Sequence, residues 1–175
     1  MIDCDKIKKE TKDLMFKLMK NSSTDHKQRY ILLCEDKGKN IISSDICIGS
    51  LCSTPIGERE KITCPESTKE IGDFRTQIVR ELGPGDIAQV AVNTLQSFCV
   101  GYVPTNTIRC FDIKNKELLR LGRNTQDLVK KRKIQEIHNI VSKMHDILKH
   151  RGYGNNWPGI LDTKCVLTRR RDDLV

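Results

Sequence analysis

Long hydrophobic runs are missing from this chain of 175 residues. No stretch approaches the roughly 18 consecutive apolar residues that a membrane-spanning helix needs. The first residues, Met1 to Lys6, become charged at once and lack the apolar segment of a signal peptide. We therefore expect neither a membrane protein nor a secreted miniprotein, and the composition also excludes a collagen or a coiled-coil fibre.

Short motifs for nucleotides and metals are missing too. There is no Gly-x-Gly-x-x-Gly sequence, and Gly83-Pro84-Gly85 is not followed by the Lys-Ser/Thr pair of a phosphate-binding loop. The four histidines do not cluster at metal-ligand spacing, and an ordinary helix surface accounts for most of them. Nothing in these patterns indicates a cofactor.

Cysteine, in contrast, is abundant, with eight residues but no Cys-x-x-Cys pair. Without a signal peptide, we expect reduced, buried thiols in a cytoplasmic protein, with disulfides as the alternative if the source is a hyperthermophile. Cys47, Cys52 and Cys64 come closest to a ligand cluster, but their spacing fits no standard zinc template. We therefore expect no metal.

Positive charge is concentrated at one end of the sequence. Residues 1–113 hold 16 basic and 16 acidic side chains, whereas residues 114–175 hold 15 basic and 7 acidic ones and so carry the whole net charge of +8. Seven basic residues are candidates for binding an anion or nucleic acid: Lys130, Lys131, Arg132, Lys133, Arg169, Arg170 and Arg171. A solvated helix face explains them equally well, and few aromatic residues accompany them to stack on bases.

Hydrophobic periodicity predicts an α+β domain with the order α-β-β-β-β-α-β-β-α. Helices are expected at residues 3–20, 87–97 and 124–150, the first of them ended by Asn21-Ser22-Ser23. Strands are expected at residues 29–34, 41–48, 61–64, 71–76, 98–103 and 107–113, and residues 165–167 are a candidate for one more. We divide the chain into a core, residues 1–113, and a basic helix and tail, residues 114–175, packed on the same domain and anchored by Trp157.

The most informative stretch is Gly72-Asp73-Phe74-Arg75-Thr76-Gln77, followed by Gly83-Pro84-Gly85-Asp86. It resembles the core of the JAB/MPN family, also called JAMM or Mov34, whose active members are zinc-dependent isopeptidases. In that family a strand ends in a Gly-x-Phe-His-Thr-His-Pro type sequence, and a loop leads to Ser-Pro-x-Asp at the start of a helix. The resemblance covers about residues 28–113. It implies a mixed sheet flanked by helices, with a cytidine-deaminase-like architecture.

The departures from that pattern decide the predicted function. Arg75 and Gln77 stand in place of the two zinc-binding histidines, Gly83 stands in place of the serine, and only Asp86 matches as a ligand. An arginine cannot bind zinc, because its guanidinium stays protonated and has no acceptor atom. We hypothesise that Arg75 occupies the vacated cation position and pairs with Asp86, with Gln77 alongside. The alternative is that Asp86 only caps the helix. Glu35 is not assigned as the family's general base.

We therefore predict a catalytically inactive, metal-free module that binds a protein partner or serves as a scaffold, alone or as a homo- or hetero-oligomer. The first alternative is a nucleic-acid-associated protein that uses the basic residues of 114–175. The second is a hydrolase, isopeptidase-like or cysteine-based, with a relocated site.

Overall fold

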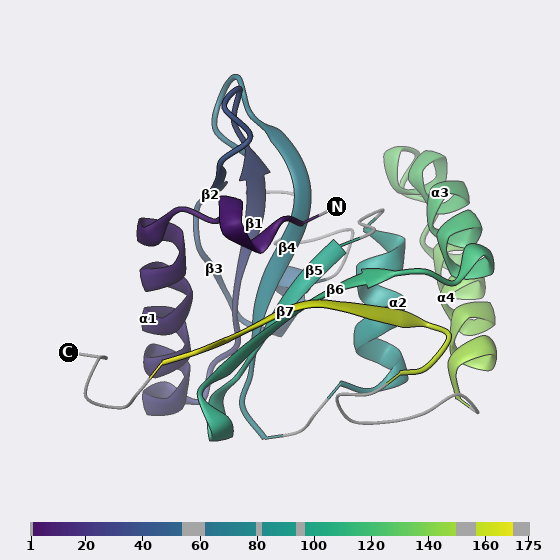
Figure 1. Cartoon of the computed structure of the whole chain (residues 1–175). Helices are drawn as coiled ribbons and strands as arrows, with labels where there is room; N and C mark the ends of the chain where they lie inside the picture. Colours follow the sequence, from purple (N-terminus) through teal and green to yellow (C-terminus); the bar gives the residue numbers. More distant parts are fainter. Residues whose placement is uncertain (1, 54–61, 80–81, 94–96, 150–156, 170–175) are drawn as a thin grey trace.

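A central mixed sheet organises the chain in the computed structural model (Figure 1). The structure describes residues 2–53, 62–79, 82–93, 97–149 and 157–169. Its seven strands follow the order β2-β1-β4-β5-β6-β7, and β3 also pairs with β1. Only β4 and β5 are parallel neighbours; the other pairs are antiparallel. The sheet does not close into a barrel, so the predicted α+β class is confirmed.

The strands lie largely where alternation and β-branched residues predict them. Their bounds are β1 Arg29–Glu35, β2 Ile41–Ser43, β3 Cys47–Ile48, β4 Lys69–Gln77, β5 Ser97–Tyr102, β6 Thr107–Ile113 and β7 Leu161–Thr168. Residues 41–48 form two short strands rather than the one predicted, because Ser44 turns inward and its hydroxyl accepts a hydrogen bond from the Leu32 amide. Residues 62–64 are not a strand, and the rest of that predicted segment and the loop before it lie outside the described residues.

Helices cover both faces of the sheet. The helix α1 (Lys9–Asp25) packs on one face through Met15, Phe16 and Met19, against side chains such as Ile31 and Phe74. The helices α2 (Pro84–Val92), α3 (Lys116–Lys130) and α4 (Ile134–Leu148) cover the other face. Figure 1 shows α1 on the left of the sheet and the other three on the right. Trp157 is buried in the core on the α2 side, as predicted for an anchor of the C-terminal segment.

Two helix predictions need correction at their ends. The first helix begins at Lys9, after a short 3₁₀ turn at Cys4–Lys6, and continues through Asn21-Ser22-Ser23 to Asp25. Ser22 does not end the helix, because its hydroxyl is buried and hydrogen-bonded to that of Thr76, 2.9 Å away. The helix ends instead at His26, which is left-handed with φ of 57°. The second helix starts earlier than expected, since Pro84 provides a suitable first turn.

The predicted helix 124–150 is in fact two helices. Its expected cap, Asn124, lies inside α3, whose true N-cap is Asn115; the Asn115 side chain accepts a hydrogen bond from the Leu118 amide. A turn at residues 131–133 separates α3 from α4, and Arg132 adopts a left-handed conformation there with φ of 53°. The observed order is therefore α-β-β-β-β-α-β-β-α-α-β. None of the described helices is long and apolar enough to cross a membrane.

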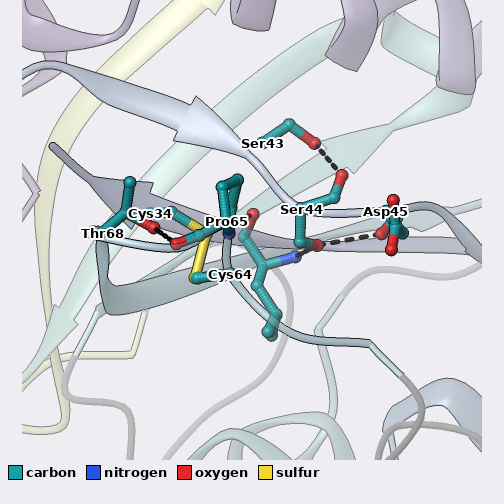
Figure 2. Close-up of a disulfide and its surroundings, with 8 residues drawn as sticks. Cys34, Ser43, Ser44, Asp45, Cys64, Pro65 and Thr68 are labelled. Carbon is teal, nitrogen blue, oxygen red and sulfur yellow. Dashed lines mark hydrogen bonds between the residues drawn. A yellow bond between two sulfur atoms is a disulfide. The ribbon is translucent and has the colours of Figure 1, made fainter.

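The cysteines are paired, so the expectation of reduced thiols is wrong. The structure contains four disulfides: Cys4–Cys165, Cys34–Cys64, Cys47–Cys52 and Cys99–Cys110. Figure 2 shows the Cys34–Cys64 bond, which joins β1 to the segment before β4. Cys64 is bonded to Cys34, and Cys47 is bonded to Cys52. The three cysteines therefore do not act together as metal ligands in this structure.

Candidate functional site

The end of β4 and the start of α2 bring the four predicted site residues together. Arg75 and Gln77 are two residues apart on β4, so their side chains lie on the same face of the sheet, the face that α2 covers. Gly83 is the N-cap of α2, and Asp86 lies in its first turn. The stretch that suggested a site in the sequence is therefore one site in space.

Arg75 lies at the bottom of this site and is held by a buried ion pair. Its side chain is 1% exposed, and its Nη2 donates to Oδ2 of Asp73, 3.0 Å away. The Tyr30 hydroxyl donates to the same Oδ2 at 2.8 Å, and the guanidinium carbon lies 5.4 Å from the centre of the Tyr30 ring. The predicted direct pairing of Arg75 with Asp86 is therefore wrong: the partner is Asp73, two residues earlier on the same strand.

The surroundings keep Arg75 charged. Burial by itself would lower its pKa, but the charge of Asp73 opposes this, with further contributions from Tyr30, from the hydrogen bond to Asp73 and from the charge of Asp86. The net effect raises the pKa of Arg75 above its ordinary value. Asp86 thus acts on Arg75 through its electric field and not through a direct contact.

Asp86 caps the N-terminus of α2 from within its first turn. Its Oδ2 accepts a hydrogen bond from the Gly83 amide at 2.8 Å and a longer one, 3.4 Å, from Nε2 of Gln77. The side-chain oxygen of Gln77 in turn accepts from Nε2 of Gln28 at 2.9 Å. The capping role is therefore confirmed, and Gln77 lies beside Asp86 as expected. Gln28 joins the site because it immediately precedes β1, which is antiparallel to β4.

A groove of about 370 Å³ opens over these residues. Residues of β4, α2 and the segment before β1 line it, among them Gln28, Arg75, Gln77, Val79, Gly85, Asp86 and Gln89. Within it, the side-chain oxygen of Gln89 is buried and has no hydrogen-bond partner among the described residues. The His145 ring of α4 lies close to Gly85, on the other side of α2's first turn. The groove is therefore lined largely by polar side chains, and the oxygen of Gln89 is buried beneath its surface.

Glu35 lies away from this groove. It is at the opposite end of β1 from Gln28, is aligned with Lys69 at the start of β4, and forms an ion pair of 3.5 Å with Lys39 in the hairpin. Leaving it unassigned as a general base is consistent with this position. The acidic residue that the sequence analysis missed is Asp73. Its place two residues before Arg75 on a strand was a signal that the two share a face.

The basic residues do not form one surface. Lys130 ends α3, and Lys131, Arg132 and Lys133 make up the exposed turn before α4. Lys131 and Lys133 lie within 4 Å of acidic side chains on those helices. In contrast, Arg169 pairs with Asp13 of α1 and lies 4.7 Å over the ring of Phe16, on the other side of the sheet.

Arg170 and Arg171 lie outside the described residues. Among the described basic candidates, the Lys130–Lys133 turn is the exposed cationic surface, whereas the charge of Arg169 is paired with Asp13 within the fold.

The site does not fit a zinc ion. Zinc is held by imidazole nitrogens, thiolates or carboxylates. Here the Asp73 carboxylate is already paired with the permanently charged guanidinium of Arg75, the Gln77 oxygen accepts from Gln28, and Asp86 is the one remaining carboxylate of the four-residue motif. A cation at this place would be repelled by Arg75, so no metal-activated water can be derived from these residues.

Comparison with known proteins adds no assignment. A scan against protein-family models matches no family, and a search of curated proteins finds no relative. The resemblance to the JAB/MPN family therefore stays a prediction from the motif.

Proposed function

We propose that this chain is a metal-free, non-catalytic domain of JAB/MPN type that binds a protein partner through the groove beside α2. One observation carries the proposal. Arg75, paired with Asp73 and lying over the Tyr30 ring, is buried, and it occupies the sequence position at which the motif of that family has a zinc-binding histidine. The guanidinium is a fixed positive charge that can neither bind a water molecule as a metal does nor lower its pKa. It therefore cannot supply the chemistry of a catalytic metal ion.

The groove has the character of a peptide-binding surface. Its lining amides, Gln28, Gln77 and Gln89, offer donors and acceptors that suit a polypeptide backbone, and the Gln89 oxygen already lacks a donor. Val79, at 83% exposure, adds an apolar contact at the rim.

A designed metal site tests the family assignment. The variant Arg75→His with Gln77→His, combined with Asp73→Asn so that no buried carboxylate is left unpaired, is expected to bind close to one equivalent of Zn²⁺ together with Asp86. The wild-type protein, stripped with a chelator, is expected to bind none at this site. Elemental analysis and Co²⁺ absorption measure both. A well-folded triple variant that binds no metal would contradict the proposed arrangement.

Site-specific cross-linking tests the binding role. A photoreactive residue at Val79 is expected to capture a partner in the source cell, and the capture should be lost when Gln77→Arg fills the groove. The matched control places the same photoreactive residue at Ile134. This residue is 53% exposed and begins α4, directly after the turn that follows α3, and it does not line the groove. Equal capture at both positions, or capture that survives Gln77→Arg, would contradict a partner in the groove.

Nucleic-acid association is the second candidate, and the exposed Lys130–Lys133 turn favours it. If it holds, binding of a random DNA or RNA duplex should weaken steeply with salt and disappear when all four residues are changed to Ser. A cysteine-based hydrolase has less support, because all eight cysteines are in disulfides and none is free to attack a substrate.

The cytoplasmic location also stays a prediction. Disulfides such as the four in this structure persist mainly in oxidising compartments or in the cytosol of hyperthermophiles.

A further inference from the structure

Two of the disulfides come together on the α1 face of the sheet. Cys99, Cys110 and Cys165 lie side by side on β5, β6 and β7, since Cys99 is aligned with Cys110 and Cys110 with Cys165. Cys4, in the 3₁₀ turn before α1, reaches the same place from the other end of the chain and is bonded to Cys165. The sulfur atoms of Cys4, Cys110 and Cys165 all lie within 4.8 Å of one another.

The two bonds differ in their access to solvent. Cys99 and Cys110 are completely buried, whereas Cys4 and Cys165 are only partly buried. A reductant in solution therefore meets the Cys4–Cys165 disulfide first. From the outer pair, the nearest inner sulfur is that of Cys110, which is half of the Cys99–Cys110 bond.

We propose that these four cysteines form a thiol–disulfide exchange site whose co-reactant is a dithiol reductant. The accessible Cys4–Cys165 bond takes up the reducing equivalents, and they pass through Cys110 to the buried Cys99–Cys110 bond. The role of the outer pair is thus to make an otherwise inaccessible disulfide reducible.

Each step exchanges one bond for another. A thiolate of the dithiol attacks the Cys4–Cys165 bond, and its second thiol then displaces the protein, leaving the dithiol oxidised and Cys4 and Cys165 as thiols. The Cys165 thiolate attacks Sγ of Cys110; a Cys110–Cys165 bond forms, and Cys99 leaves as a thiolate that takes up the proton given up by Cys165. Cys4 then attacks Cys165, which releases Cys110. The outer bond is restored, and the inner pair has gained two electrons and two protons.

A single substitution traps the exchange. In Cys165→Ser, Cys4 is left as a thiol close to Cys110, so we expect part of the protein to contain a Cys4–Cys110 disulfide and a free Cys99. Alkylation in acid followed by peptide mass spectrometry under non-reducing conditions identifies both. If Cys4 is simply alkylated and Cys99–Cys110 stays intact, the proposal is overturned.

The chain provides a matched control on the opposite face of the sheet. Cys34–Cys64 and Cys47–Cys52 share one core cluster, but among the described residues no three of their sulfur atoms come as close together as those of Cys4, Cys110 and Cys165. In Cys52→Ser, the freed Cys47 is therefore expected to be alkylated with Cys34–Cys64 unchanged. A rearrangement as extensive as that in Cys165→Ser would show only unspecific shuffling, and would overturn the proposal.

Reduction kinetics supply a second measurement that does not depend on a trapped state. Under native conditions, dithiothreitol is expected to reduce Cys99–Cys110 at least about tenfold more slowly in Cys4→Ser with Cys165→Ser than in the wild-type protein, since the relay thiols are gone. An unchanged or faster rate in that double variant would mean that the inner bond is reached directly, and would overturn the proposal.

Discussion

Replacing Arg75 by Met tests the buried ion pair on which the candidate site depends. The substitution keeps an unbranched side chain of similar length but leaves the Asp73 carboxylate, 0% exposed, with only the Tyr30 hydroxyl as a donor. Breaking a buried pair in this way costs about 3–5 kcal/mol. For a chain of 175 residues, an unfolding entropy of about 2.1 cal/mol/K per residue converts this into a fall in Tm of about 8–14 °C.

Two further variants isolate the pair. Arg120→Met removes an arginine that pairs with Glu117 at the surface, where both side chains are about half exposed, and is expected to leave the stability nearly unchanged. Asp73→Asn combined with Arg75→Met removes both charges and is expected to recover about 2 kcal/mol or more of the loss seen in Arg75→Met.

Urea unfolding without reductant, followed by the fluorescence of the buried Trp157, measures each free energy. Urea is preferred to a guanidinium salt because it does not screen the charges. If Arg75→Met is no more costly than Arg120→Met, the argument for a buried cation at the site fails.

Three other predictions concern the scaffold. The Cys4–Cys165 bond closes a loop with a sequence separation of 161, so replacing both residues by Ser should cost about 5 kcal/mol in urea unfolding; a loss below 1 kcal/mol would contradict the chain-entropy argument. The hydrogen bond from Arg29 holds the pKa of Asp25 well below its usual range. As the pH falls, Asp25 is therefore protonated in the unfolded chain before it is protonated in the folded one, so the free energy of unfolding should decrease below about pH 4, and less steeply in Asp25→Asn. Equal dependence on pH in the two proteins would contradict the lowered pKa. A Cβ at Gly122 would collide with the backbone carbonyl of Ala91 in α2. Gly122→Ala should therefore push α3 away from α2 and lower the free energy of unfolding by about 1–3 kcal/mol, measured by thermal unfolding.

The sequence predicted most of the sheet because the strands carry strong local signals. In β5 and β6, alternation and β-branched or aromatic residues give the type and nearly the bounds of each strand. The turn between α3 and α4 carried no such signal. Its residues, Lys131, Arg132 and Lys133, suit a solvated helix, and the left-handed Arg132 replaces the glycine that a sequence pattern would use to mark a helix end.

The four residues that the sequence singled out lie together in the structure, but the predicted pairing between Arg75 and Asp86 is wrong. Strand alternation places the side chains of Asp73 and Arg75 next to each other on one face of β4. Arg75 therefore pairs with Asp73 rather than with Asp86, which reaches the site only through a loop. The contribution of Tyr30 depends on the register between β1 and β4, which pairs it with Arg75 and which no local pattern encodes. Disulfide partners, up to 161 positions apart, are hidden from local patterns for the same reason.

The bond between Cys4 and Cys165 joins the first described turn to the last described strand, with a sequence separation of 161. Cys4 leaves the ribosome long before its partner exists, while Cys99 and Cys110 become available in between. Until β7 is made, Cys99 and Cys110 on the paired strands β5 and β6 are the cysteines nearest to Cys165 in the fold that Cys4 can meet. Only the arrival of β7 gives Cys4 its native partner, so the native set of disulfides can be completed only after that strand has been made.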